Sequence, residues 1–529
     1  MAKICLCLTA KTLERNLEIL NKYRKQADMA ELRVDCLEPD ERLLIRRFPQ
    51  MTDVPIVLTI RRDTDGGFFT GGEGARINLM ARGLAYADAD RRRNFAYLDI
   101  EEDLDVPSLE EAAGTFGTRI IRSYHNFKGA DGNLSVKLKS MCHSGGDIVK
   151  ASVMANSSGD VLNLLRVGKE CAGQDKILVA MGHYGVYSRI LSEKFGSYLS
   201  FACAHSEPDA PPAASGQIDI LELANLYRFK SITNATKVYG VTGHPLRVTD
   251  SPFIFNTVFA LEGIDAVYVP FPADSIEVFM EVARELDVAG ASVTVPYKEA
   301  VIPFLTDQSA GVRNIHACNT LSRIPQGWMG TNTDAMGFSD SLLAFTGRTN
   351  LKRLRITVIG AGGVARAVVS ELYRLGAKVL ILNRTAHKAY NLAAHYKFAW
   401  GGLDKQSIEM MYKYRDIIVQ TSSAGMEGHN PEDQPSAGEP LNPGDSSGQN
   451  DLSGQNDPLT MYRFCGREEV MDLVYKPKMT PFLRRAAAAG CRVQNGYDML
   501  IRQAGYQYTQ FTNKEFPQQM LSRVQFHGV

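Results

Sequence analysis

Short runs of β-forming residues alternate with charged, helix-compatible stretches over the first 230 residues of the chain. Strands that alternate with helices build parallel sheets, because each crossover between parallel strands needs a connection of helix length. An open doubly wound sheet also alternates, but eight repeats in a segment of this length are typical of a closed (β/α)8 barrel. The sequence therefore predicts an α/β fold that begins with a TIM barrel over 1–230, with strands at 4–10, 31–37, 55–61, 96–101, 119–125, 147–155, 177–182 and 198–204.

Two further α/β patterns follow. One begins at Lys237 and has strand-like runs at 264–269 and 290–295, and the other begins with a strand-like run at 356–359 that leads into glycines. Because the chain's last residues are helix-compatible, we expect them to fold back on the first of these regions. The sequence therefore predicts an α/β domain made of 237–340 and 481–529, and a Rossmann domain at 345–480.

An insertion interrupts the predicted Rossmann domain at 427–459, and it is rich in Gly, Pro, Ser, Asn and Asp. Such a composition buries too little apolar surface to offset the entropy of ordering. We therefore expect a mobile insertion, either a tolerated loop expansion or a lid.

Charge balance and cysteine spacing exclude several classes of protein. The 529 residues carry 59 basic and 59 acidic side chains, and this neutrality argues against binding to nucleic acid or to anionic membranes. The nine cysteines have no metal-ligand or disulfide-framework spacing, so we expect reduced thiols and no metal site. No signal peptide or membrane-spanning run is found. We expect a cytoplasmic protein with small-molecule ligands, whose oligomeric state the sequence does not define.

One lysine stands out among the charged residues of the predicted barrel. Lys150 interrupts the run Ile148-Val-Lys-Ala-Ser-Val-Met, where a buried ammonium is costly unless its pKa falls or a partner neutralises it. A desolvated lysine is the nucleophile of Schiff-base chemistry. Other candidates at the strand ends, each of which alone is more often a solvated rim residue, are Glu31, Arg33, Asp35, Arg61, Asp99, Glu101, His125 and Arg189.

Six short motifs connect these residues in order. The chain reads Glu31-Leu-Arg-Val-Asp, Leu58-Thr-Ile-Arg with Asp65-Gly-Gly, Ser123-Tyr-His-Asn-Phe, Ile148-Val-Lys, Gly185-Val-Tyr-Ser-Arg and Gly216-Gln. In this order the motifs resemble type I 3-dehydroquinate dehydratases. The resemblance implies that 3-dehydroquinate loses water through an imine on Lys150, with His125 transferring the protons.

The same resemblance implies roles for the residues around this pair. Asp65 would orient His125, and the substrate would be bound by Glu31, Arg33, Arg61, Arg189 and Gln217, with Arg189 gripping its carboxylate. The closing loop departs from the family pattern, because Ala213-Ala-Ser-Gly-Gln stands where Ser-Ala-Pro-Gly-Gln is usual. This departure puts one contact between lid and substrate in doubt.

A glycine-rich turn opens the third region. Gly360-Ala-Gly-Gly-Val-Ala follows a strand and precedes a helix, the setting in which backbone N–H groups face a pyrophosphate. The next strand, 378–382, ends in Asn383-Arg-Thr, without the carboxylate that NAD enzymes use, and an arginine suits a 2′-phosphate. The sequence predicts an NADP site formed by Gly360, Ala361, Gly362, Gly363, Val364, Ala365, Asn383, Arg384, Thr385 and Lys388.

A lysine and an aspartate of the second region would complete a dehydrogenase. Lys298 ends Ser292-Val-Thr-Val-Pro-Tyr-Lys and Asp334 ends Gly330-Thr-Asn-Thr-Asp. Such a pair can supply the proton that a carbonyl oxygen takes up during reduction, although alone it would be interpreted as a surface lysine and a loop aspartate. Further motifs are Gly243-His-Pro-Leu-Arg-Val-Thr-Asp-Ser-Pro, Val474-Tyr-Lys-Pro-Lys-Met and Gly496-Tyr-Asp-Met-Leu-Ile-Arg-Gln. Together they resemble shikimate dehydrogenases.

This second resemblance implies reduction of 3-dehydroshikimate to shikimate with NADPH, with Lys298 and Asp334 as the catalytic pair. It places the substrate contacts at Thr249, Ser251, Thr294, Asn319, Tyr475 and Gln503. Three positions depart from the family pattern, which has serine at Thr249 and asparagine at Ser292 and Gln420.

Two alternatives stay open. The dehydrogenase half could prefer quinate, because the extra methyl group of Thr249 can shift a pocket's preference by about 1–3 kcal/mol. The chain could also be a regulatory protein that keeps both folds without turnover, although all four catalytic side chains are present.

Overall fold

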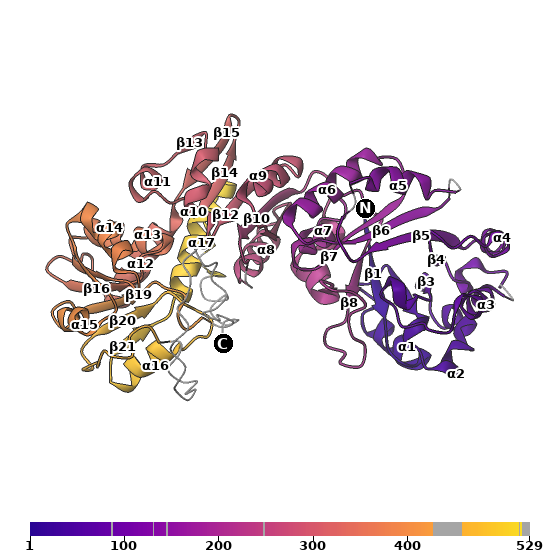
Figure 1. Cartoon of the computed structure of the whole chain (residues 1–529), viewed down its shortest axis with the longest axis horizontal. Coiled ribbons are helices and arrows are strands. Elements are labelled where there is room, and N and C mark those ends of the chain that lie inside the picture. The colour runs from indigo at the N-terminus through magenta and orange to yellow at the C-terminus, as the bar shows by residue number, and fades with distance from the viewer. Residues whose placement is uncertain are drawn as a thin grey trace, which may run out of the picture. The chain divides into compact units, whose positions relative to one another are not determined.

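The computed structural model describes residues 1–85, 88–130, 132–143, 146–246, 249–426, 457–517 and 519–520. They divide into two compact units, Met1–Ala291 and Ser292–Val529, whose colours run from indigo to yellow along the chain in Figure 1. The border falls inside strand β12 (Val288–Val293). Of the predicted insertion at 427–459, residues 427–456 lie outside the described residues.

Eight parallel strands run around the first part of the first unit, as predicted for a TIM barrel (Figure 1). Neighbours in sequence pair from β1 to β7, and β8 pairs with β1. The ring closes between β7 and β8, where the Tyr198 N–H donates to the Lys176 carbonyl oxygen at 2.6 Å. The eight strands are β1 (Lys3–Leu8), β2 (Met29–Arg33), β3 (Ile56–Thr59), β4 (Tyr97–Glu101), β5 (Arg119–Asn126), β6 (Ile148–Met154), β7 (Lys176–Met181) and β8 (Leu199–Cys203). A short ninth strand, β9 (Ile218–Asp219), was not predicted.

The barrel strands are buried on both faces, which is why they read as continuous apolar runs. All six residues of β7 are buried. One face fills the barrel interior with side chains such as Met29, Val57, Ile121 and Phe201. Between the strands lie the helices α1 (Leu13–Lys22), α2 (Pro39–Arg42), α3 (Glu73–Leu84), α4 (Pro107–Phe116), α5 (Leu134–Ser140), α6 (Ser158–Glu170) and α7 (Val186–Ile190).

The first unit continues beyond the barrel with a strand–helix alternation. β10 (Lys237–Gly243) and β11 (Ala266–Pro272) pair in parallel. They are joined by α8 (Ser251–Leu261), and α9 (Ile276–Glu285) leads from β11 to β12. The strands predicted at 264–269 and 290–295 are therefore present, each displaced by about two residues at its start.

The second unit begins with short elements and one long helix. These are α10 (Tyr297–Ala300), β13 (Asp307–Gln308), α11 (Ala310–Ile315), β14 (Thr320–Ile324), β15 (Gly327–Thr331) and α12 (Thr333–Thr346). The C-terminal helix α17 (Tyr497–Thr512) lies beside α12 (Figure 1).

A six-stranded parallel sheet follows in the order β18-β17-β16-β19-β20-β21, which is the strand order of dinucleotide-binding Rossmann domains. Its strands are β16 (Arg355–Ile359), β17 (Lys378–Leu382), β18 (Ala399–Gly401), β19 (Ile417–Gln420), β20 (Glu469–Asp472) and β21 (Arg492–Gln494). Its helices are α13 (Gly363–Arg374), α14 (Ala386–Tyr396), α15 (Lys405–Met411) and α16 (Pro481–Ala488). Because β21 completes this sheet, the segment before α17 joins it, whereas we expected the domain to end at 480.

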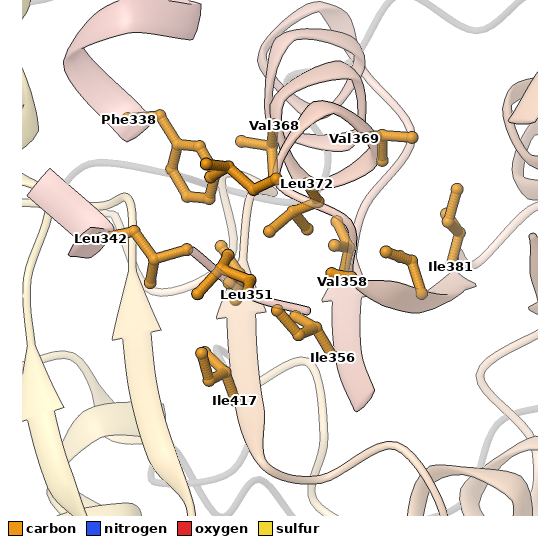
Figure 2. Close-up of a cluster of buried hydrophobic side chains, with 14 of the residues drawn as sticks. Phe338, Leu342, Leu351, Ile356, Val358, Val368, Val369, Leu372, Ile381 and Ile417 are labelled. Atoms are coloured by element: carbon orange, nitrogen blue, oxygen red, sulfur yellow. The ribbon is translucent and has the colours of Figure 1, made fainter. Parts of the chain in front are cut away.

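Helix α12 packs against the Rossmann sheet through an apolar core. Figure 2 shows Phe338 and Leu342 of α12 facing Val368 and Leu372 of α13 above Ile356 of β16. All of these side chains are fully buried. This core fixes the first turn of α12, which carries Asp334, against the domain that carries the glycine-rich turn.

Two absences hold for the described ranges. In them, no helix is long and apolar enough to cross a membrane. Nor do three or more His, Cys, Asp or Glu side chains within these ranges form a group able to hold a metal ion.

Candidate active sites

The lysine predicted as a nucleophile lies on β6, inside the barrel. The Lys150 side chain is 6 % exposed, and its Nζ donates to the Asp99 carboxylate at 2.9 Å. The same ammonium lies 4.7 Å from the centre of the Phe201 ring. A buried ammonium can be tolerated if its pKa falls or if an anion pairs with it. In this structure Lys150 is paired with an anion, Asp99.

Asp99 belongs to a buried network of alternating charges. Arg61 pairs with Asp99 at 2.6 Å and with Glu101 at 2.8 Å, and Arg76 pairs with the other oxygen of Glu101. Burial by itself raises the pKa of Asp99, but Arg61 and Lys150 outweigh it and hold that pKa below its usual range. Asp99 is therefore an anion between two cations. The sequence places Asp99 and Glu101 among the charged residues at strand ends, but it does not predict which residues they pair with.

His125, on β5, faces the same side of the sheet as Lys150, because Ser123 pairs with Lys150 and His125 pairs with Ser152 in one ladder. Its imidazole is 7 % exposed, and its Nδ1 has no hydrogen-bond partner among the residues that the structure describes. Burial lowers the pKa of His125 well below its usual value, and the nearby Arg61 and Lys150 lower it further. The imidazole is therefore a neutral base at neutral pH.

The predicted orienting group of this histidine lies slightly too far away for a hydrogen bond. The Asp65 Oδ1 atom is 3.8 Å from His125 Nδ1, while Asp65 Oδ2 pairs with Arg62 at 2.7 Å. A small shift of the loop that carries Asp65 would close the gap.

Arg189 is a buried cation that has no carboxylate partner among the described residues. It is 2 % exposed, its Nη2 donates to the Ser215 carbonyl oxygen at 3.1 Å, and within the described ranges its Nε has no hydrogen-bond partner. Burial lowers the pKa of this guanidinium to about 10. An anionic ligand would supply the missing charge and the missing acceptor.

The closing loop is joined to β1 and β2 by a row of side chains. Gln217 donates to the Cys7 sulfur at 3.1 Å, and Cys7 in turn donates to the Glu31 carboxylate at 3.2 Å. Arg33 forms a two-pronged pair with Asp35 at 2.7 and 3.0 Å. Sequence reasoning missed Cys7, because a thiol in an apolar run cannot be told from a core residue.

Lys298 and Asp334 lie together in the second unit. Lys298 Nζ donates to Asp334 at 2.6 Å, and each side chain is 9 % exposed. The Asn319 amide donates to the other Asp334 oxygen at 2.8 Å, and it also donates to the Gln503 side-chain oxygen at 3.2 Å. Four predicted residues from separate parts of the chain thus form one polar cluster.

For the remaining predicted substrate contacts, the structure gives only their unit, their burial and a few neighbours. Thr249 and Ser251 belong to the first unit, with their hydroxyl oxygens 3.2 Å apart. Thr294 and Tyr475 are half-buried in the second unit, and the Tyr475 ring lies 6.1 Å from that of Tyr497.

The glycine-rich turn lies between β16 and α13. Gly360 has φ +111°, and a Cβ there would lie 2.5 Å from the Thr421 hydroxyl oxygen. Gly362 is the N-cap of α13, and a Cβ on it would meet no described atom within 4 Å. A Cβ at Gly363 would lie 3.4 Å from Lys298 Cδ. The turn thus leaves open N–H groups for a pyrophosphate beside the lysine of the polar cluster.

The end of β17 carries no carboxylate at 383–385. Asn383 donates to the Thr385 carbonyl oxygen at 3.0 Å, which shapes the turn that presents Arg384. Gln420, one of the departures, is fully buried and donates to the carbonyl oxygens of Ser422 and Ala424 at 3.1 Å each. Its side chain therefore braces the loop after β19.

Family comparisons divide the chain into three matching segments. The model described as type I 3-dehydroquinase matches residues 4–234. The model of the shikimate dehydrogenase substrate binding domain matches 241–321, and that of shikimate / quinate 5-dehydrogenase matches 343–428.

Three named relatives extend this comparison. A bifunctional 3-dehydroquinate dehydratase/shikimate dehydrogenase of Arabidopsis thaliana, named as chloroplastic, is 29 % identical over 98 % of this chain and 84 % of its own. A pentafunctional AROM polypeptide of Malassezia globosa is 28 % identical over 96 % of this chain but 31 % of its own. A shikimate dehydrogenase (NADP(+)) of Pyrococcus abyssi is 32 % identical over 54 % of this chain and 97 % of its own. The chain belongs to the shikimate dehydrogenase family and carries a type I 3-dehydroquinase domain before it, so that it is a bifunctional enzyme of the shikimate pathway.

Proposed function

We propose that the barrel converts 3-dehydroquinate to 3-dehydroshikimate through an imine on Lys150, and that the dehydrogenase half reduces this product to shikimate with NADPH. The first step is supported by the pairing of the buried Lys150. Its partner carboxylate, Asp99, also pairs with a second cation, Arg61. Because Arg61 also neutralises Asp99, Lys150 can lose its proton without leaving that buried anion unpaired.

The dehydration then follows from the two neighbouring side chains. The Lys150 amine adds to the substrate ketone and expels water, and the resulting iminium draws electrons from the adjacent C–H bond. The neutral His125 removes that proton and returns it to the departing β-hydroxyl group, which leaves as water. Hydrolysis of the imine releases 3-dehydroshikimate and restores the lysine.

Binding falls to the residues around this pair. Arg189 grips the substrate carboxylate, since it is a buried guanidinium that has no carboxylate partner in the described structure and whose Nε is left without an acceptor there. Gln217 would assist Arg189 at the carboxylate, Glu31 and Arg33 would hold the ring hydroxyl groups, and Asp65 would orient His125. For Arg61 we propose a role through Asp99 instead of direct contact with substrate, because its guanidinium already pairs with Asp99 and Glu101.

In the dehydrogenase half, Lys298 holds the proton that the carbonyl oxygen takes up, and Asp334 holds the ammonium in place. Bound NADPH supplies the hydride. Its pyrophosphate would lie on the turn 360–365, and Arg384 with Lys388 would receive the 2′-phosphate. Thr249, Ser251, Thr294, Asn319, Tyr475 and Gln503 would bind the carboxylate and hydroxyl groups of the substrate.

One coupled assay tests both halves. The purified chain is given 3-dehydroquinate and NADPH, and loss of NADPH absorbance with formation of shikimate is the expected result. Borohydride added with 3-dehydroquinate should leave a covalent adduct on Lys150. An active chain that forms no such adduct would contradict the imine, and a chain inactive in both assays would favour a regulatory protein.

A quinate preference is the second candidate, and Thr249 is the observation that favours it. Its hydroxyl lies 3.2 Å from that of Ser251, so its extra methyl group adds bulk close to that serine. Rates of NADP+ reduction with shikimate and with quinate, compared for the native chain and Thr249→Ser, decide between the two. A cytoplasmic location likewise stays a proposal, because the Arabidopsis relative is named as chloroplastic.

A further inference from the structure

Behind the dehydrogenase pair, a line of buried side chains runs to the Asp334 carboxylate. We propose that Gln507, with Ser292 and Thr320, is a positioning residue that acts through Asn319 to hold Asp334 against Lys298. This inference rests on the proposed role of the Lys298–Asp334 pair. The hydrogen bonds run in one direction through Ser292, Gln507, Thr320, Asn319 and Asp334.

The last member of the line, Asn319, has its amide orientation fixed from behind. Its Oδ1 accepts from the Thr333 backbone N–H at 2.8 Å, and a backbone N–H can only donate. The amide nitrogen must therefore face the other way, where it donates to Asp334 at 2.8 Å. The Thr320 hydroxyl reinforces this orientation, since it donates to the same Asn319 Oδ1 at 2.8 Å.

Gln507 determines which way the Thr320 hydroxyl points. Its Nε2 donates to Thr320 Oγ1 at 2.9 Å, so the hydroxyl proton is left for the other neighbours. Of these, Asn319 Oδ1 at 2.8 Å lies nearer than the Thr333 hydroxyl oxygen at 3.2 Å. The Gln507 amide is itself oriented at both ends. Its Nε2 also approaches the Asn319 main-chain oxygen at 3.4 Å, and its Oε1 accepts from the Ser292 hydroxyl at 2.8 Å.

Burial makes this line sensitive to any missing member. Ser292 is 8 % exposed, Gln507 1 % and Thr320 0 %, so water cannot easily replace a lost partner. Aligned hydrogen bonds in a low-dielectric interior also strengthen one another. The line gives a structural account of the departure at Ser292, because its short hydroxyl meets the carbonyl group of Gln507.

The test compares two glutamines of α17. Gln507→Leu removes the line, whereas Gln510→Leu removes a similar bond that Gln510 accepts from Thr331 at 2.6 Å, on the same helix but outside the line. We measure kcat and KM for 3-dehydroshikimate reduction from pH 6 to 10, thermal stability, and dehydratase activity of the same chains. For Gln507→Leu, kcat should fall roughly tenfold with little change in the KM for NADPH. The basic limb of the kcat profile should move to lower pH, because a displaced Asp334 stabilises the Lys298 ammonium less. Gln510→Leu should keep the native profile.

A second pair of variants, at Thr320, tests the same inference if Gln507→Leu fails to fold. Thr320→Val removes the hydroxyl at constant volume and should reproduce the loss of kcat and the shifted limb, while Thr320→Ser should restore both. If Gln507→Leu and Thr320→Val only lose stability and keep the profile of Gln510→Leu, the line is structural and the inference is wrong. Failure of the proposed function is seen separately, because Lys298→Ala would then stay active.

Discussion

Each half of this chain buries a lysine against an aspartate, but the two pairs have different surroundings. Lys150 lies 2.9 Å from Asp99 in the barrel, and Lys298 lies 2.6 Å from Asp334 in the dehydrogenase. Asp99 has Arg61 as a second cation at 2.6 Å. Asp334 has a neutral partner instead, the Asn319 amide at 2.8 Å, and Lys298 is its only cation among the described residues.

This difference separates two uses of a buried lysine. A Schiff-base lysine has to spend part of the cycle as a neutral amine, and the second cation keeps Asp99 balanced during that time. A proton-donating lysine has to hold its proton until the carbonyl oxygen needs it, and a carboxylate with no competing cation favours the ammonium. The same pair of residue types thus suits a nucleophile or an acid, depending on the third partner.

A further buried aspartate, Asp472, extends the comparison to a carboxylate that has no cationic partner among the described residues. Asp472, at the end of β20, is fully buried and accepts hydrogen bonds from the Thr480 hydroxyl at 2.6 Å and the Val474 N–H at 3.0 Å. Burial raises the pKa of Asp472 to about 7, because no cation among the described residues counters it. Among the described residues, two cations therefore pair with Asp99, one pairs with Asp334 and none pairs with Asp472.

The largest effect is expected from Lys150→Met. Dehydratase activity should fall by more than about 10³-fold, because the imine cannot form, while shikimate oxidation by the same chain stays near native. Activity and borohydride trapping with 3-dehydroquinate measure this. The matched control is Lys176→Met on β7, a buried lysine that donates to the Cys171 carbonyl oxygen at 3.0 Å and should keep both activities. Equal losses in both lysine variants would mean that Lys150 is merely structural.

Lys298→Met should give the mirror image with a somewhat smaller effect. Shikimate oxidation should fall about 10²–10⁴-fold, the range for a lost general acid or base, and dehydratase activity should stay unchanged. NADP+ binding, measured by calorimetry, should remain close to native, since the glycine-rich turn is intact. Loss of dehydratase activity in this variant would show that the halves do not act independently.

Asp99→Asn tests the pairing of this carboxylate with both Arg61 and Lys150. Removing this anion leaves Arg61 and Lys150 buried without it, which should destabilise the barrel by about 3 kcal/mol. Hydrogen exchange of the barrel amides in the whole chain measures the loss. Asp334→Asn should destabilise the second unit less, because one cation faces it and both side chains are 9 % exposed. Equal destabilisation by the two variants would remove the distinction between the pairs.

The sequence predicted the strands and the charged residues of these sites but not their partners. Eight strands could be found because parallel strands buried on both faces read as apolar runs. The Rossmann turn could be found because its glycines, strand and helix are adjacent in sequence. Lys150 stood out because it interrupts an apolar run.

Partners across strands left no local signal. Asp99 meets Lys150 through the register of β4, β5 and β6, 51 positions apart in the chain. Cys7 reads as a core residue, and Gln507 as one more polar residue of a helix. The predicted role of Arg61 changes for the same reason, because spacing cannot show that Asp99 and Glu101 already occupy its guanidinium.

Asp472, which has no cationic partner in the described part of the chain, should make the second unit less stable as pH rises. The folded state keeps the proton up to a pKa of about 7, whereas the unfolded chain loses it near pH 4, so this contribution is full at low pH and is lost as pH rises through 7. Between pH 6 and 8 the loss should be about 1.4 kcal/mol. Urea unfolding followed by tryptophan fluorescence reports on this unit, which contains both tryptophans, Trp328 and Trp400. Asp472→Asn should flatten the decline and exposed Asp416→Asn should not, and a decline that persists in Asp472→Asn would refute the assignment.

The smallest effect concerns the barrel's base. Burial, Arg61 and Lys150 hold the pKa of His125 well below its usual value, so the imidazole should stay neutral and the dehydratase kcat should stay level between pH 7 and 6. An ordinary histidine would lose about two-thirds of its neutral form over that interval, and the rate would fall about threefold. Proton NMR of histidine-labelled chain checks the cause. If His125 instead gains a proton between pH 7 and 6 and the rate falls with it, then the negative charge of Asp99 acts on His125 more strongly than the two neighbouring cations do. The contrast between the barrel pair and the dehydrogenase pair would then be smaller.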